Sequence, residues 1–204
     1  MKKPLLALLL LASLVPAVHA QGSRSDLVMK NVKKLDVLIQ IVPLALTKEQ
    51  IGPLLLALEK GHQKEKTMLA QEDKDLLTIE AKTQKVVDDA IKNGKYPPHE
   101  VQGELATFMR IMGVRRTGYA TEIVDIVYDA CTKTLNAGQI KIMEKSLKPE
   151  LLDPSLKADT MDSATKVKFF IRKVILDPVA YDVLIEMSKQ PAQPASAPTT
   201  SPSI

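Results

Sequence analysis

The sequence contains few of the residues on which many kinds of protein function depend. It has one cysteine, three histidines and no tryptophan in 204 residues, and aromatic side chains make up 3% of it. A single cysteine excludes a disulfide scaffold, and eight glycines exclude a collagen-like chain. So few aromatic side chains do not provide the stacking platform of a single-strand nucleic-acid binder. The hydrophobic fraction of 45% is nonetheless that of a folded protein, which excludes global disorder.

The first twenty residues have the pattern of a secretory signal peptide. Two lysines precede an apolar run over 5–15, and small residues form a cleavage pattern that ends at Ala20. The run is too short to span a bilayer, and no second run approaches its length. We therefore expect cleavage after Ala20, a periplasmic or secreted protein, and no membrane association; an uncleaved anchor is the alternative. Cleavage leaves 28 − 2 = 26 basic and 24 acidic residues, a balance of +2 that does not favour nucleic acid.

Apolar residues recur at helical spacing from Asp26 to Leu184, and no stretch alternates as a half-buried strand does. The sequence therefore predicts an all-α fold. A short first helix, which Pro43 ends, is indicated by five apolar residues at steps of four and three. These are Val28, Val32, Leu35, Ile39 and Val42.

Two long helices are predicted next, over 48–91 and 98–134, joined by a short turn that makes them an antiparallel hairpin. Asn93-Gly94 ends the first, and prolines open the second, where a missing amide donor does no harm. Opposing residue numbers should sum to about 192, which places Leu76 near Arg116 and Leu69 near Ile123 within about one helical turn. The expected seam of the first long helix includes His62, Glu65, Leu69, Glu72 and Leu76.

Shorter helices follow the hairpin. One is expected over 136–147, a second begins at Asp159 or Thr160, and Asp177-Pro178 opens a third that runs to about Lys189. The chain thus divides into a signal peptide (1–20), a hairpin domain (21–147), a helical extension (148–189) and a tail (190–204). The tail holds four prolines and no charged side chain, a composition typical of disorder.

The same helix-start design occurs twice. Thr47 and Asn136 are N-cap acceptors, and a glutamine three residues later can reach back to the cap amide, as in a capping box. Leucines before the caps and isoleucines after them occupy the positions of a hydrophobic staple. The two motifs comprise Leu46, Thr47 and Gln50, and Leu135, Asn136 and Gln139.

This arrangement resembles the Spy and CpxP family of periplasmic proteins, in which such LTxxQ boxes open the second and fourth helices. The resemblance covers 28–147, with Asn136 where the family prefers threonine. It implies a long hairpin that forms a homodimer shaped as a curved cradle. It also implies an ATP-independent chaperone for unfolded proteins or a modulator of envelope-stress signalling, and related proteins sense metals.

The segment 109–119 is the most unusual part of the predicted hairpin. It combines mobile methionines, paired arginines, an aromatic ring and two glycines within a helix, which is typical of an adaptable binding surface. The alternative is that its apolar residues are hairpin core, that Arg115 pairs with an opposing carboxylate such as Glu80, and that the glycines permit close helix approach. The candidate client-binding residues are Met109, Met112, Arg115, Arg116 and Tyr119.

Metal and enzyme chemistry have little support in the sequence. His62 could approach Cys131 across the hairpin with Glu65 one turn away, but no paired ligand spacing such as H-x-x-H or C-x-x-C is present. The carboxylates alternate with lysines along helix faces, which is typical of solvated surfaces. No glycine-rich loop that would cradle a nucleotide phosphate is present. We therefore predict no enzyme activity, cofactor, metal or nucleotide.

The favoured interpretation is an exported helical binding protein that holds unfolded or envelope proteins. The alternatives are a metal-binding or metal-sensing protein on the same scaffold, and a structural adaptor that docks one fixed partner through its last helices.

Overall fold

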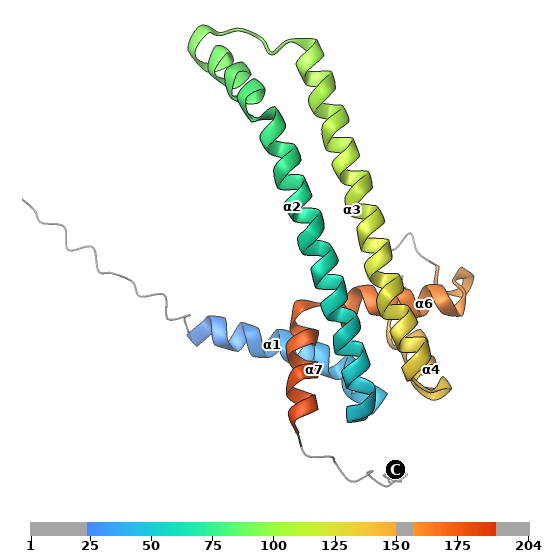
Figure 1. The fold of residues 1–204 in the computed structure, drawn as a ribbon. Coiled ribbons are helices and arrows are strands. Elements are labelled where there is room, and N and C mark those ends of the chain that lie inside the picture. Colours follow the sequence, from blue (N-terminus) through green and yellow to red (C-terminus); the bar gives the residue numbers. More distant parts are fainter. Residues whose placement is uncertain (1–23, 150–156, 191–204) are drawn as a thin grey trace, which may run out of the picture.

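The computed structural model describes residues 24–149 and 157–190 (Figure 1). The predicted signal peptide and all of the predicted tail except Gln190 lie outside these ranges. Every regular element within them is helical, which confirms the all-α prediction. No helix in the described ranges is both long and apolar enough to cross a membrane.

The long helical hairpin is formed by α2 (Lys48–Asn93) and α3 (His99–Thr134), which run antiparallel side by side (Figure 1). The predicted first and last residues of both long helices are correct to within two residues. Thr47 caps α2 with a complete capping box, and Gly94 ends it with φ 62°, a left-handed conformation that costs glycine little. Pro53 lies in the second turn of α2, and the helix continues through it.

Shorter helices surround the base of the hairpin, where α2 begins and α3 ends (Figure 1). They are α1 (Arg24–Ile41), the 3₁₀ turn η1 (Val42–Leu44), α4 (Ala137–Ser146), the 3₁₀ turn η2 (Ala158–Thr160), α6 (Ser163–Phe170), the π-helical turn η3 (Ile171–Ile175) and α7 (Pro178–Lys189).

The predicted caps of the later helices are right in one case and wrong in another. Asp177 caps α7, with its carboxylate accepting from the amide of Val179 at 2.8 Å. The cap of α6 is Asp162 rather than Asp159 or Thr160, which lie in η2. Several Asp and Thr residues precede this helix, and the sequence does not show which of them takes the extended backbone that a cap needs.

The hydrophobic core lies at the base and is shared by the hairpin and the later helices. Leu58 of α2, Val127 of α3, Phe170 of α6 and Leu184 of α7 are each at most 1% exposed and belong to one cluster. The hairpin base and the C-terminal helices therefore stabilise each other.

The first helix turns an unexpected face to the core. Val37 and Ile41 are buried, whereas all five residues of the stripe that indicated this helix are more than half exposed. We call this stripe the α1 seam; it comprises Val28, Val32, Leu35 and Ile39 of α1 and Val42, the first residue of η1. An amphipathic stripe normally covers a core, so its exposure needs an explanation.

The pairing of the two long helices differs from the predicted register. Arg116 binds Glu72, one turn from the expected Leu76, and the side chain of Ile123 lies against Gly61, two turns from the expected Leu69. Leu69 and Leu76 are 46% and 43% exposed, so these two positions of the predicted seam are wrong, whereas Glu72 between them is buried as predicted. The observed pairs sum to 188 and 184 rather than 192, although the link between α2 and α3 is centred on residue 96 as the prediction assumed.

Candidate partner-binding surface on the hairpin

The residues predicted to bind clients do not share one exposed surface. Met109 is 62% exposed, but Met112 is buried at 5%. Arg115 and Tyr119 are half-buried, and the Tyr119 ring has the ammonium of Lys64 5.8 Å from its centroid. Only part of the predicted set is therefore accessible to a partner in this conformation.

Arg116 and Glu72 form a bidentate ion pair across the hairpin. The Arg116 Nε donates to Glu72 Oε1 at 2.8 Å, and Nη2 donates to Oε2 at 2.7 Å. The Glu72 side chain is 3% exposed and that of Arg116 is 60% exposed, so the guanidinium covers the carboxylate from the solvent side. These hydrogen bonds lower the pKa of Glu72 and raise that of Arg116.

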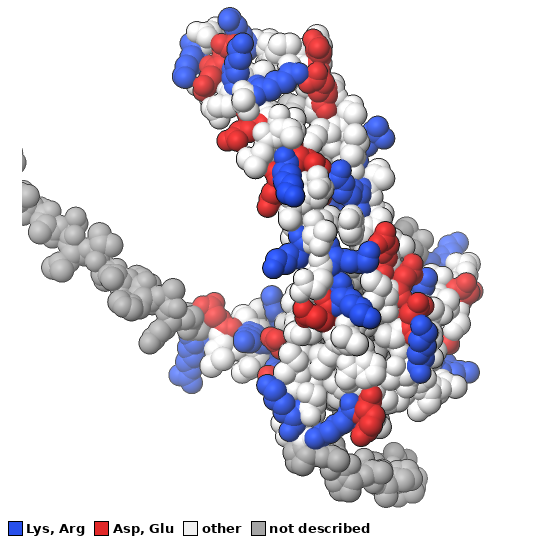
Figure 2. Space-filling view, viewed as in Figure 1, with Lys and Arg blue, Asp and Glu red and all other residues white. Residues whose placement is uncertain are grey.

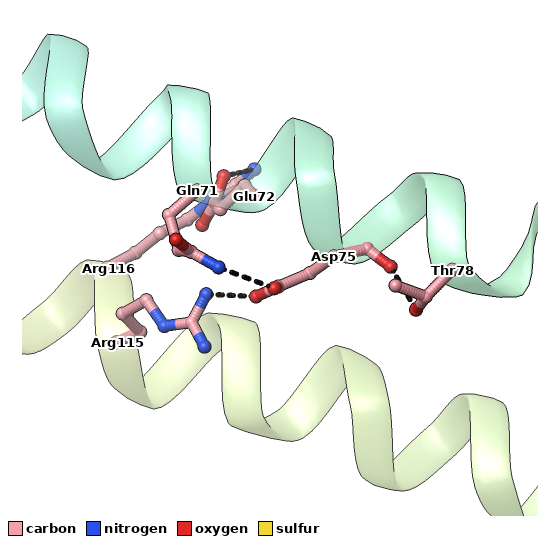
Figure 3. Close-up of polar contacts among 6 residues, drawn as sticks. All are labelled: Gln71, Glu72, Asp75, Thr78, Arg115 and Arg116. Carbon is pink, nitrogen blue, oxygen red and sulfur yellow. Dashed lines mark hydrogen bonds and ion pairs between the residues drawn. The ribbon is translucent and has the colours of Figure 1, made fainter.

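A second ion pair lies one turn away, between Arg115 and Asp75 (Figure 3). Gln71 also donates to Asp75 Oδ1, at 2.8 Å. The hydrogen bond from Arg115, followed by that from Gln71, lowers the pKa of the Asp75 carboxyl. Arg115 does pair with an opposing carboxylate, as one alternative predicted, but Asp75 takes the place of Glu80.

The paired arginines therefore connect α2 to α3. Their donors point at Glu72 and Asp75 rather than outward (Figure 3). An acidic partner would have to compete with two partly buried carboxylates that are already in place. The arginines are better explained as a polar layer that fixes how the helices pair than as an anion site.

The accessible apolar surface lies farther along the hairpin, toward its free end. An open groove of about 530 Å³ runs between the two helices there. Its apolar walls come from Ile79, Val101, Leu105, Phe108 and Ile111. The ion pair between Lys82 and Glu104 lies at the groove.

Exposed apolar side chains continue beside this groove. Those of α3 are Met109, Ile111 and Val114, at 62%, 47% and 66% exposure, and Leu77 of α2 is 67% exposed. Acidic and basic side chains are interspersed along the face of the hairpin in Figure 2. The hairpin thus presents apolar contacts separated by charges of both signs.

The sequence analysis did not find this groove. It arises where the two helices leave space between them, and an added Cβ at Gly103 would meet no atom within 4 Å. The sequence did hold one signal for the groove. Gly103 lies close to Leu105 and Phe108, and these two apolar residues are three positions apart and so share one helix face.

The structure does not bring His62 and Cys131 together. The His62 ring packs edge-on against Tyr181 of α7, with the ring centroids 5.1 Å apart. Cys131 is fully buried in the core, and burial raises the pKa of its thiol to about 12. Among the described residues, no group of three or more His, Cys, Asp or Glu side chains is placed to hold a metal ion.

The two helix-start motifs meet at the base of the hairpin. Gln50 Nε2 donates to Gln139 Oε1 and Gln139 Nε2 donates to Gln50 Oε1, both at 2.9 Å. Gln139 also donates to the carbonyl of Leu44, and Gln50 to the carbonyl of Thr134. Each glutamine therefore closes its own capping box and links to the other motif.

In comparisons with known proteins, no family model, curated protein or solved structure matched this chain. The case for a function therefore depends on the residues and their geometry.

Proposed function

We propose that this chain is an exported helical binding protein that holds unfolded or envelope proteins without ATP. The observation that carries the proposal is the distal hairpin surface, where an open apolar groove adjoins exposed residues such as Met109 and Val114. Unfolded segments expose apolar side chains, and a shallow groove flanked by charges can bind many of them weakly.

Other features support the same proposal. The signal pattern that ends at Ala20 indicates export to a compartment where a chaperone works without ATP. The doubled helix-start motif resembles that of the Spy and CpxP family, whose members include such chaperones.

The test is suppression of aggregation of an unrelated unfolding protein. Protein in several-fold excess over the client should reduce light scattering, and added ATP should change nothing. A double variant in the distal surface, Ile111→Gln with Val114→Gln, should lose most of this effect because two of the exposed apolar contacts are gone.

The matched control is Leu56→Gln with Leu69→Gln, two side chains of α2 that are 59% and 46% exposed but lie closer to the base than the groove. It should retain suppression. An inert wild-type protein would refute the proposed function, whereas equal activity of both variants would refute only the site.

A further inference from the structure

We infer that the α1 seam is a dimerisation surface, on which a second copy of this chain packs its own seam as a parallel two-stranded coiled coil. The inference concerns α1 and does not depend on the function proposed for the hairpin.

The first argument is that none of the described residues covers the seam. Its five side chains are between 53% and 60% exposed, although Val37 and Ile41 anchor the opposite side of the same helix. Every residue over 24–33 is exposed, and Figure 1 shows this end of α1 extending beyond the body. A helix in water gains most of its stability from packing an apolar face. An uncovered segment as short as 24–33 is therefore only marginally stable as a helix.

The spacing of the seam fits a helical partner. Its members follow steps of four, three, four and three, which is the a and d pattern of two successive heptads. At 100° per residue they fall within about a quarter of the helix circumference, the narrow stripe of a coiled-coil seam rather than the wider arc that faces a lipid surface or a core.

The residue types favour two parallel copies. Val32 and Ile39 occupy a positions and Leu35 the central d position, the β-branched and leucine choices that favour parallel dimers, while Val28 and Val42 hold the outer d positions. Asn31 at g would then face Asp36 at e of the second copy, an amide that can donate to a carboxylate, and the two-fold axis repeats the pair. No like charges would face each other at these flanking positions.

The exposed apolar area of the seam sets the expected strength of the contact. Leu27 and Met29 add exposed apolar surface beside the seam, at 59% and 56% exposure. Together these side chains present roughly several hundred Å² per copy, which is less than the roughly 800 Å² per partner of a standard interface. We therefore expect a dimer of modest affinity.

The experiment measures the mass of the purified protein by sedimentation equilibrium, using the full-length chain after any processing in the producing cell. Wild type should show the dimer mass at about 100 µM and dissociate on dilution. Val32→Lys with Ile39→Lys should be monomeric throughout, because two lysines per chain would meet their copies at a positions. The control, Leu77→Lys with Val114→Lys, removes two exposed apolar side chains from the hairpin and should dimerise as wild type does.

A monomeric wild type at this concentration would overturn the inference, as would a dimer that survives Val32→Lys with Ile39→Lys. A monomer that instead sediments with anionic lipid vesicles would assign the seam to a membrane surface.

Crosslinking tests the parallel alignment of the two copies in a chain that keeps the other four seam residues. Val28→Cys should form a disulfide-linked dimer on mild oxidation, since parallel packing places it against its own copy, and Cys131 is buried. Lys33→Cys, on the outer side of the same helix, should not. Failure of Val28→Cys to crosslink would rule out the parallel arrangement even if the double lysine variant fails to fold.

Discussion

At the residue scale, two polar side chains in the described part of the chain are buried, and each is hydrogen-bonded to a specific set of partners. Glu72 accepts three hydrogen bonds from Arg116, and Gln139 joins the cap of its own helix to Gln50 and Leu44. A buried polar group without partners would destabilise the fold. The partners of Glu72 and Gln139 lie far away in sequence, so these contacts also fix which segments meet.

The Glu72 ion pair predicts a pH-dependent contribution to stability. The pKa of Glu72 is lower in the folded chain, mainly because Arg116 donates to the carboxylate. Its stabilisation is therefore fully present above the unfolded-state pKa of about 4.3 and is lost as the pH falls through the folded-state pKa. Glu72→Gln should lower the urea unfolding midpoint at about pH 7, and its difference from wild type should shrink steadily as the pH falls below about 4.

The control for this prediction is Glu80→Gln, an exposed carboxylate on the same helix. It should change the free energy of unfolding by less than about 0.5 kcal/mol across this pH range. An equal effect of Glu72→Gln across this pH range would show that the side chain acts through packing rather than charge.

At the element scale, the glycines of the hairpin have different roles from those expected. One of the two interpretations of the segment 109–119 was that Gly113 and Gly118 permit close helix approach, but an added Cβ at either would meet no atom within 4 Å. The close approach occurs at Gly61, where an added Cβ would lie 3.0 Å from Ile123 Cγ2. The contact between the helices is therefore tightest near the base.

This difference predicts opposite effects of the same substitution. Gly113→Ala should stabilise the protein by roughly 0.5–1 kcal/mol, because alanine favours a helix interior and has room there. Gly61→Ala should stabilise the protein less than Gly113→Ala does, or destabilise it, because the Ile123 side chain must move to make room for the added methyl group. Thermal unfolding of the two variants beside wild type measures both. A gain at Gly61 equal to that at Gly113 would contradict the close packing.

At the scale of the whole molecule, stability is unevenly distributed along the hairpin. The large hydrophobic cluster lies at the base, and its members on α2 and α3 end at Leu58 and begin at Val124. Farther out, the buried side chains are few and separated, among them Met68, Val101 and Met112. The distal hairpin is held by these residues, by ion pairs and by helix propensity.

Hydrogen exchange should reveal this gradient. Amides over 77–93 and 99–110 should be protected at least about tenfold less than those over 54–61 and 124–131, because few apolar contacts oppose local opening. Low urea should speed exchange near the base while leaving distal exchange nearly unchanged. Uniform protection along both helices would mean that the hairpin unfolds as one unit with the base.

Much of the helical map followed from local sequence signals. The capping boxes at Thr47 and Asn136, the left-handed Gly94 and the Asp177-Pro178 start all lie where they were predicted. Each of these signals acts between residues within about four positions of one another, so it is readable without the rest of the fold. The candidate site was less predictable, because the groove depends on how far apart two helices lie.

The sequence by itself thus determined the helical class, the ends of the long pair and the antiparallel order of that pair. Only the tertiary structure decided the register of α2 on α3 and which side of α1 faces inward. The reason is that α1 carries two apolar faces, the seam and the pair Val37 and Ile41. The periodicity of the sequence identified only the seam, and the face that turns inward depends on what the core formed by distant helices can cover.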